Sequence, residues 1–414
     1  MPVRPSAGGP VPIQFDVDPT VAQLAEATSA FVREVVIPAE RACGGSVHDA
    51  PETLRETLQK GAHDAGVFAP HVPTRWGGHG LDLRGQAVVF EAAGYSLLGP
   101  LALNCAAPDE GNMHLLEMVA TEDQKERYLR PLAAGEVRSC FAMTEPAPGA
   151  GADPRSLRTT AIRVPGGWRI DGRKWFISGA NGAGFAIVMA RTSGSPGDPG
   201  GATMFLVDAG TAGMSIVRDI ETLDEGLFAG HSEIVFDACV VGDDQVLGEV
   251  GHGFAGAQVR LGPARMTHCM RWLGAARRAQ DVALERAGSR MAFGSVLGDL
   301  GMVQQMLADS EIDIEASRAL ILRTAWELDT GSAAAQLTSV SKTFVAEAVN
   351  RVVDRAVQIC GALGISAADA PLARLLREVR PFRIYDGPSE THRFAIARRA
   401  VRPYRRPGEG GADA

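Results

Sequence analysis

The sequence is poor in lysine and in closely spaced cysteines. Only four lysines, Lys60, Lys125, Lys174 and Lys342, occur among 41 basic residues, and the net charge is -8. Binding to a phosphate backbone needs a broad basic surface, so nucleic acid is not an expected partner. The six cysteines include no C-x-x-C pair, which argues against a disulfide framework or a zinc site and fits a reducing cytoplasm.

Long hydrophobic runs and the common catalytic motifs are also missing. The longest uncharged run, residues 92–108, is too short and too polar to span a bilayer, and the first 20 residues lack the apolar segment of a secretory signal. We therefore expect a cytoplasmic protein without a membrane span. The sequence contains no H-E-x-x-H and no G-x-S-x-G, and the G-x-G segments at 149–151 and 182–184 do not continue to a third glycine. A metal site, an α/β-hydrolase and a Rossmann domain are not indicated.

What the chain does contain is ordinary globular composition, with 45% hydrophobic and 22% charged residues over 414 positions. That length suggests several domains. Apolar spacing is helical over 19–136, short alternating or β-branched runs follow over 137–251, and long helical segments return over 252–403. We expect a multi-domain α+β protein with an N-terminal helical domain, an antiparallel β-barrel or sandwich and a C-terminal four-helix bundle. Residues 1–18 and 404–414 are expected to be a flexible lead-in and tail.

Three segments carry chemically useful residues. The first, from Cys140 to Asp153, places hydroxyl, carboxylate and small residues on a Gly/Pro-rich loop after a short apolar strand. In the second, Phe176 and Ser178 are two residues apart and are expected on one strand face, where they could cover a planar ligand and hydrogen-bond to it. In the third, Asp386 precedes Gly387, Pro388 and the last helix. A carboxylate there is usually a helix cap, but in a buried site it could act as a base.

Taken together, these segments resemble the acyl-CoA dehydrogenase family of flavoproteins. The resemblance covers residues 19–401 and includes the order of the three domains. Its most specific motifs, in order along the chain, are M-T-E-P with G-A-D (143–153), K-W-F-I-S-G (174–179), R-M-A-F-G (290–294), Q-I-C-G-A-L-G (358–364) and I-Y-D-G-P-S-E (384–390).

The resemblance implies an FAD cofactor. It implies that Phe141, Met143 and Thr144 lie along the isoalloxazine edge, and that Phe176 stacks near the ring while Ser178 donates to flavin N5. Residues that match positions binding the FAD of a neighbouring subunit are Arg290, Phe293, Gln358 and 361–364, including Gly361 and Gly364. Ser389 and Glu390 match positions closing over the cofactor. A shared FAD site implies a homodimer or homotetramer.

The resemblance also implies the reaction, which is α,β-dehydrogenation of an acyl-CoA thioester to the 2-enoyl-CoA. Asp386 is expected to remove the α-proton while the β-hydrogen leaves as hydride to flavin N5, and the Asp386 N–H is expected to polarise the thioester oxygen. Substrate positions are implied at Ala152, Arg265, Tyr385 and Gly387. An electron-transferring flavoprotein is the implied electron acceptor.

The chain departs from the family pattern at three positions. Most members have Glu at the position of Asp386. One branch of acyl-CoA dehydrogenases with the same D-G-P context has Asp there, and so do the nitroalkane oxidases. Some members have a Glu base at the position that aligns with Ala264. Alanine has no group that can accept a proton, which leaves Asp386 as the candidate base. Ala152 replaces a common Ser, and Phe176 replaces the usual Trp.

These departures keep other functions open. A flavin oxidase or monooxygenase similar to nitroalkane oxidase is favoured by the Asp and the altered cofactor contacts. A dehydrogenase of a carrier-protein-bound acyl group is equally compatible with the motifs. A non-enzymatic scaffold that kept the fold is the third alternative, and it predicts no bound FAD.

Overall fold

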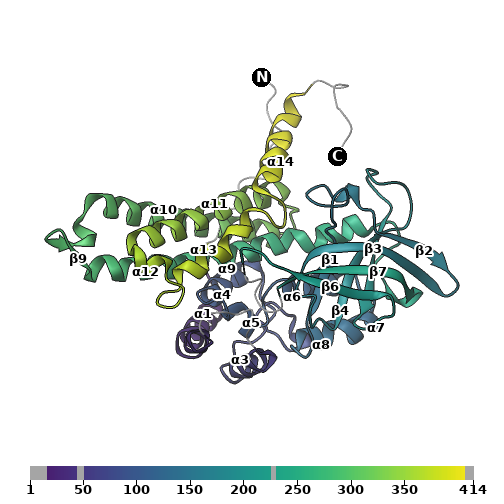
Figure 1. The fold of residues 1–414 in the computed structure, drawn as a ribbon, viewed down its shortest axis with the longest axis horizontal. Coiled ribbons are helices and arrows are strands. Elements are labelled where there is room, and N and C mark those ends of the chain that lie inside the picture. Colours follow the sequence, from purple (N-terminus) through teal and green to yellow (C-terminus); the bar gives the residue numbers. More distant parts are fainter. Residues whose placement is uncertain (1–15, 44–50, 225–229, 406–414) are drawn as a thin grey trace.

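The computed structural model describes residues 16–43, 51–224 and 230–405. Apart from residues 16–18 and 404–405, the predicted flexible lead-in and tail lie outside the described residues. Helices form both ends of the described chain and strands form the middle, which confirms the expected three-part fold (Figure 1). The predicted boundaries after residues 136 and 251 stay predictions. The last N-terminal helix ends at Ala133, the first strand begins at Ser139, and helix returns at Gly253.

The N-terminal part is built from helices whose starts are marked by capping residues. The helices are α1 (Pro19–Phe31), α2 (Ile37–Ala42), α3 (Glu52–Asp64), α4 (Leu83–Gly94), α5 (Gly99–Ala102), α6 (Asp109–Val119), α7 (Glu122–Gln124) and α8 (Arg130–Ala133). The Asp18 carboxylate accepts a hydrogen bond from the Thr20 N–H at 2.8 Å and so caps α1. The capping box expected at Thr121 and Gln124 is confirmed, because each side chain bonds to the other residue's N–H.

The middle part is one sheet that is mostly antiparallel. Its strands are β1 (Ser139–Ala142), β2 (Thr160–Val164), β3 (Gly167–Ser178), β4 (Phe185–Arg191), β5 (Ala202–Asp208), β6 (Met214–Ile220), β7 (His231–Gly242) and β8 (Val246–Leu247). The strand order is β6-β7-β3-β2-β4-β5-β8, and β1 pairs with β4. The β1–β4 and β2–β4 pairings are parallel, which the antiparallel expectation missed. The ladder between β3 and β7 is irregular between Lys174 and Ile177, so β3 bulges at the K-W-F-I-S-G motif.

The C-terminal part is the expected bundle with a short hairpin and two additional short helices. Its elements are α9 (Gly253–Ser289), β9 (Met291–Ala292), β10 (Ser295–Val296), α10 (Gly301–Asp329), α11 (Ala335–Cys360), α12 (Ala362–Ile365), α13 (Leu372–Val379) and α14 (Ser389–Val401). Helix α9 packs on α4, α6, α10 and α11. Its crossing with α4 is very close, because a Cβ on Gly94 would lie 1.9 Å from the Arg271 carbonyl oxygen, and one on Gly274 would lie 2.0 Å from that of Glu91.

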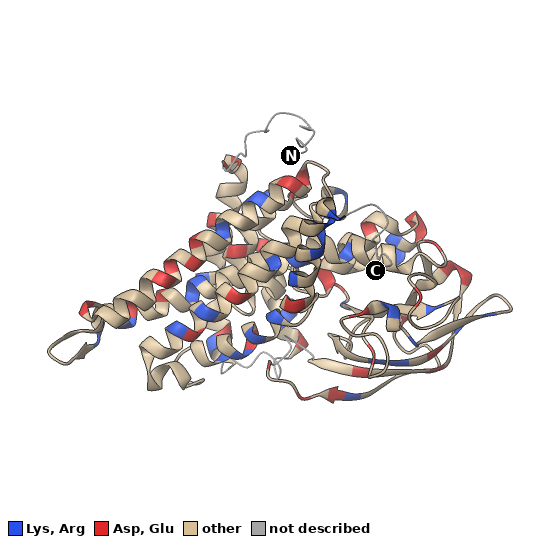
Figure 2. Cartoon of the chain, turned by 90° about the horizontal axis from the view of Figure 1, so that it is seen from above, with Lys and Arg blue, Asp and Glu red and all other residues tan. Residues whose placement is uncertain are grey.

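Two hydrophobic cores hold these parts together. The larger core joins the N-terminal helices, the bundle and one face of the sheet, while a smaller one lies within the β-domain. Acidic and basic residues are interspersed along the bundle helices (Figure 2). In the described ranges, no helix is long and apolar enough to cross a membrane, and no group of three or more His, Cys, Asp or Glu residues is placed to hold a metal ion.

Candidate active site

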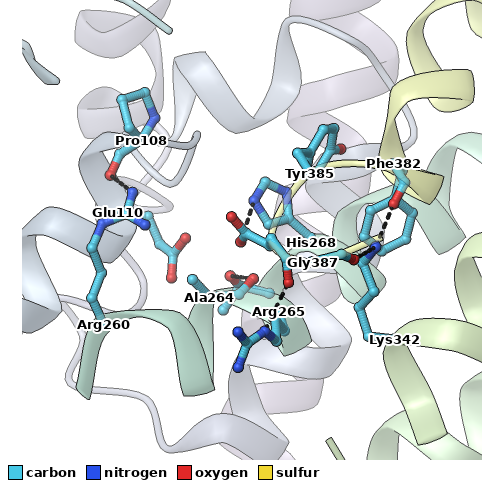
Figure 3. Close-up of polar contacts among 12 residues, drawn as sticks. Pro108, Glu110, Arg260, Ala264, Arg265, His268, Lys342, Phe382, Tyr385 and Gly387 are labelled. Carbon is cyan, nitrogen blue, oxygen red and sulfur yellow. Dashed lines mark hydrogen bonds and ion pairs between the residues drawn. The ribbon is translucent and has the colours of Figure 1, made fainter. Parts of the chain in front are cut away.

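Asp386 lies in the turn before α14, and a buried lysine on α11 holds this turn. Lys342, with 0% of its surface exposed, donates from Nζ to the Phe382 carbonyl oxygen at 2.8 Å and to that of Gly387 at 2.7 Å (Figure 3). Hydrogen bonds from a charged donor are stronger than neutral ones. A single side chain therefore fixes both ends of the segment that carries Asp386.

The backbone of Asp386 itself is held by two more donors. Its carbonyl oxygen accepts from Arg265 Nε at 2.9 Å and from His392 Nε2 at 3.1 Å. Asp386 has a φ of 53° and Gly387 a φ of 99°, both in the left-handed region. Such a conformation at a non-glycine residue costs about 1–3 kcal/mol and persists where surrounding contacts enforce it. A Cβ at Gly387 would lie 2.7 Å from His392 Nε2, so close approach also requires glycine there.

The Asp386 side chain faces a histidine on α9. His268 Nε2 lies 3.3 Å from Asp386 Oδ2, and both side chains are largely buried (Figure 3). His268 Nδ1 lies 3.2 Å from Arg271 Nη2, which can only donate, so Nδ1 is the acceptor and Nε2 carries the hydrogen that points toward Asp386. Burial lowers the pKa of His268, which favours this neutral form. Oδ2 forms no well-aligned hydrogen bond with a described residue.

The electrostatics around Asp386 favour its ionised form. Burial by itself raises the pKa of this carboxyl, but His268 and the charges of Arg260 and Arg265 hold the pKa below its ordinary value. Arg260 is buried on α9, and its Nε donates to Asn112 Oδ1 at 2.7 Å. Asp386 is thus expected in its ionised form, which is the form in which a carboxylate can accept a proton.

A buried ion pair holds His268 on its Nδ1 side, away from Asp386. Arg271 Nη1 lies 3.2 Å from Glu110 Oε2 and donates to the Cys105 carbonyl oxygen at 2.9 Å. The guanidinium is therefore fixed by α6 and by the segment before it while it binds His268. Asp386, His268, Arg271 and Glu110 form a continuous series of polar contacts, which we call the Asp386 series.

Tyr385 is a neutral neighbour of this series. Its hydroxyl accepts a hydrogen bond from Trp272 Nε1 at 2.5 Å, and its ring centroid is 4.9 Å from that of His268. Burial raises the pKa of Tyr385 well above its ordinary value. The side chain therefore contributes shape and an aromatic surface rather than charge.

The loop of the first motif is held by a buried ion pair. Lys174 Nζ lies 2.8 Å from Glu145 Oε1, and the same carboxylate accepts from the backbone N–H groups of Arg158 and Thr159. Thr144 Oγ1 donates to the Trp175 carbonyl oxygen at 2.6 Å, which ties this loop to β3. The ion pair joins the first two motifs, so residues far apart in sequence present one surface.

Phe176 and Ser178 lie on that surface at the end of β3. Phe176 has a φ of 52° and is 46% exposed, while its neighbour Ile177 is buried, so the bulge aims the Phe176 ring away from the domain core. Ser178 Oγ is 2.8 Å from His231 Nδ1, and His231 Nε2 is 3.0 Å from Asp224 Oδ2. We call these three residues the Ser178 relay.

The predicted cofactor residues of the bundle lie elsewhere. Arg290 and Phe293 flank β9 at one end of the long axis, and Gln358 and Gly361 lie at the end of α11, whereas β3 is at the other end (Figure 1). Arg290 and Gln358 are exposed, and Phe293 is 97% exposed. A single chain therefore does not bring the two sets of predicted FAD residues together.

The remaining predicted residues have simple surroundings. Met143 offers its carbonyl oxygen to Lys174 at 3.1 Å, and the Phe141 ring lies 4.4 Å from the Arg260 guanidinium carbon. Ala152 is exposed and Gly364 is buried.

Near the last helix, Ser389 is buried in the first turn of α14 while Glu390 beside it is exposed. The N-cap position of this helix is Pro388, which makes no side-chain capping hydrogen bond.

Several residues were missed by the sequence reasoning. His268, Arg260, Arg271, Lys342, His231 and Asp224 all contact predicted site residues or each other. One signal was available, because residues 260, 264, 268 and 271 recur at helical spacing on one face of α9. Polar residues on an otherwise apolar helix face were a sign of a buried polar site.

Comparison with known proteins identifies the family. Models of the acyl-CoA dehydrogenase N-terminal, middle and C-terminal domains match residues 18–136, 140–239 and 251–401. The chain belongs to the acyl-CoA dehydrogenase family. This confirms the expected FAD-dependent oxidoreductase, a flavoprotein of that family with FAD as its cofactor.

Individual relatives agree with this assignment. "Probable acyl-CoA dehydrogenase FadE2" of Mycobacterium tuberculosis is 41% identical over 382 residues, 89% of this chain and 92% of the relative. "Acyl-CoA dehydrogenase family member 11" of Gallus gallus is 36% identical over 89% of this chain, which spans about half (49%) of that longer protein.

Solved structures share the fold as well. A structure of an acyl-CoA dehydrogenase from Mycobacterium abscessus superposes with a TM-score of 0.87 at 34% identity, covering 94% of this chain and 99% of the other. The FAD complex of PigA has a TM-score of 0.82 at 25% identity, covering 94% and 99%.

Proposed function

We propose that this chain catalyses the FAD-dependent α,β-dehydrogenation of an acyl thioester, an acyl-CoA, with Asp386 as the base. The observation that carries the proposal is the Asp386 carboxylate. It is buried, is held in a strained turn by Lys342, Arg265 and His392, and has an oxygen without a well-aligned hydrogen bond. Buried carboxylates left partly unsatisfied at an enforced φ above zero are typical of functional sites.

The residues divide the work as follows. Asp386 takes the α-proton, and its own N–H, presented by the left-handed turn, donates to the thioester oxygen as negative charge develops there. His268 Nε2 lies 3.3 Å from Oδ2 and orients the carboxylate without a well-aligned hydrogen bond to it. Ala264 on α9 offers no competing acid or base, so one carboxylate performs the proton transfer.

A bound FAD would supply the hydride acceptor, so that the substrate would lose one proton to Asp386 and one hydride to the cofactor and become the 2-enoyl thioester. The residues proposed to hold it fit a planar aromatic group, because the chain leaves the Phe176 ring half exposed beside the Ser178 hydroxyl. Thr144, Met143 and Phe141 line the same side from β1 and the loop after it.

The second set of cofactor residues requires a second copy of the chain. Arg290 and Phe293 flank β9, Gln358 and Gly361 lie at the end of α11, and Phe176 lies on β3. Strands β9 and β3 lie toward opposite ends of the molecule (Figure 1). We propose that the four residues of the bundle contact the FAD of a neighbouring subunit in a homodimer or homotetramer. An electron-transferring flavoprotein as acceptor, and substrate contacts from Ala152, Arg265, Tyr385 and Gly387, belong to the same proposal.

The test is the absorbance spectrum of the purified protein, followed by anaerobic addition of short, medium, long and branched acyl-CoAs. The proposal predicts a flavin band that one class of acyl-CoA bleaches. Asp386→Asn should keep the flavin band and lose at least about a hundredfold in the rate of bleaching, the low end for a general base. Asp386→Glu is the matched control because it restores a carboxylate.

Other results would overturn the proposal in identifiable ways. Equal bleaching rates in the Asn variant would remove Asp386 as the base. A flavin band that responds to no acyl-CoA, reduces with a nitroalkane and reoxidises rapidly in oxygen would assign the oxidase function instead. Bleaching by an acyl carrier protein thioester and by no acyl-CoA would show that the acyl carrier is that protein and not CoA. Purified protein that binds no flavin would favour the non-enzymatic scaffold.

A further inference from the structure

The Ser178 relay has no role in the proton transfer at Asp386. Asp224 Oδ2, His231 and Ser178 Oγ are connected by contacts of 3.0 and 2.8 Å. The histidine and the aspartate are largely buried, with 16% and 11% of their side-chain surfaces exposed. Ser178 is the residue proposed above to donate to flavin N5, so the present inference rests on the proposed function.

The donors in this relay follow from the chemistry of each group. Contact with His231 outweighs burial and lowers the pKa of Asp224, so its carboxylate can only accept, and His231 Nε2 donates to it. His231 Nδ1 is then an acceptor when the ring is neutral and a donor when the ring is protonated. The Ser178 hydroxyl has one hydrogen, and the state of Nδ1 decides where that hydrogen points.

Two arrangements result. With neutral His231, Ser178 donates to Nδ1 and has no hydrogen left for a cofactor nitrogen. With protonated His231, Nδ1 donates to Ser178 Oγ, and the hydroxyl hydrogen is free to point to flavin N5. After hydride arrives, N5 carries a hydrogen of its own and needs an acceptor, which Ser178 provides when it donates to neutral His231.

We propose that the Ser178 relay couples the protonation of His231 to the oxidation state of the bound flavin. His231 binds its proton more tightly when the flavin is oxidised and releases it to solvent when hydride is accepted. Ser178 touches the cofactor and is the catalytic residue of this relay, while His231 and Asp224 are positioning residues that act through it.

The other charged groups near His231 are already engaged. On the paired strand β6, Asp219 accepts from Ser232 Oγ at 2.7 Å and from Asn181 Nδ2 at 3.1 Å. Glu233, next on β7, pairs with Arg173 and Arg218.

Beyond the sheet, Tyr385 lies near enough for the Asp224 charge to act on it, and burial raises its pKa, so it stays neutral.

The experiment measures the reduction potential of the FAD-loaded protein against pH. In the native protein there should be a pH range in which reduction takes up one proton fewer per two electrons, because His231 releases one. Ser178→Ala and His231→Gln should remove that range. Asp224→Asn should move it to lower pH, since His231 loses the neighbouring negative charge that favours its protonation.

Ser232→Ala is the matched control, because it lies next to His231 but bonds to Asp219, and it should keep the native profile. A second readout is the absorbance of the oxidised flavin against pH, which should show one ionisation that disappears in Ser178→Ala and His231→Gln.

Identical potential profiles in all variants would overturn the relay. If acyl-CoA still bleaches the flavin in that case, the proposed function stands while the relay falls. Protein that binds FAD but is bleached by no acyl thioester, with an intact pH profile, would be the reverse result.

Discussion

The two regions proposed to serve one reaction are built in opposite ways. The Asp386 series is complete within one chain, buried, and joined by contacts of 3.3 Å or less from the carboxylate to Glu110. The proposed cofactor residues are divided between β3 and the far end of the bundle, and Phe176 and Phe293 are left exposed at 46% and 97%. The acid–base centre is assembled by folding, whereas the cofactor site needs further components.

This difference has a physical reason. An ionised carboxylate must be held by donors that the chain supplies, because unsatisfied buried charge is costly. Aromatic and glycine residues can remain exposed to solvent at little cost in free energy until a planar ligand or another subunit covers them. Variants in the first region should therefore disturb stability and proton transfer, and variants in the second should disturb cofactor content.

The largest expected effect is on the ion pair behind His268. Arg271→Met leaves Glu110 buried without its partner and should lower the free energy of unfolding by about 3–5 kcal/mol. Denaturant unfolding of the purified protein measures it. Adding Glu110→Gln should recover part of the loss, and Lys60→Met, at the exposed pair with Asp64, should change it by less than about 1 kcal/mol. Equal effects of Arg271→Met and Lys60→Met would contradict the importance of burial at the first region.

A smaller effect is expected at the histidine itself. His268→Gln removes a group that lowers the pKa of Asp386, so the acid limb of the kcat/KM profile should move to higher pH. Loss of the polar contact that orients the carboxylate should also reduce kcat/KM at neutral pH, by about tenfold. Steady-state kinetics over pH tests both. His392 contacts only the backbone of Asp386, so His392→Gln should leave the acid limb at its native pH. An acid limb that is unchanged in His268→Gln would show that His268 does not influence the pKa of Asp386.

The pH dependence of stability should show the same carboxylate. The pKa of Asp386 is lowered in the folded state, so its ionisation stabilises the fold fully above the ordinary Asp value of about 3.9 and less as pH falls below it. The difference in unfolding free energy between the native protein and Asp386→Asn should therefore shrink as pH falls through about 4. A difference that is constant from pH 7 to 3 would show that the carboxyl is not held in its ionised form.

The smallest effect on folding is expected in the second region. Phe293→Ala should change the unfolding free energy by less than about 0.5 kcal/mol, because the side chain is almost fully exposed. The same variant should lower the FAD content per chain, measured by absorbance after gel filtration. Met302→Ala on α10, also exposed at 80%, is the control that should retain FAD. Full FAD retention in Phe293→Ala would remove this residue from the cofactor site.

The sequence predicted the fold well for reasons that are local. Helical and alternating periodicity, the capping box at Thr121 and the order of the motifs each depend on residues close together in the chain. The two parallel pairings of β1 and β2 with β4 were missed because strand neighbours are set by the whole sheet.

The site was predicted less completely, for the same kind of reason. Asp386 could be singled out beside its turn, but His268 and Lys342 approach it from α9 and α11, and the polar spacing along α9 does not reveal which residue His268 faces. His231 likewise contacts Ser178 only because β3 pairs with β7, and Asp224 joins them through its contact with His231.

The length of α9 has a mechanical consequence. Its 37 residues span about 55 Å at 1.5 Å per residue, and the helix carries His268 along its length and leads directly into Arg290. If Arg290 serves the cofactor of a second copy, each α9 contributes to two reaction centres, one along its length and one beyond its C-terminal end. A shift of α9 along its axis would then displace a residue at both centres, so the geometries of the two centres are coupled through one helix.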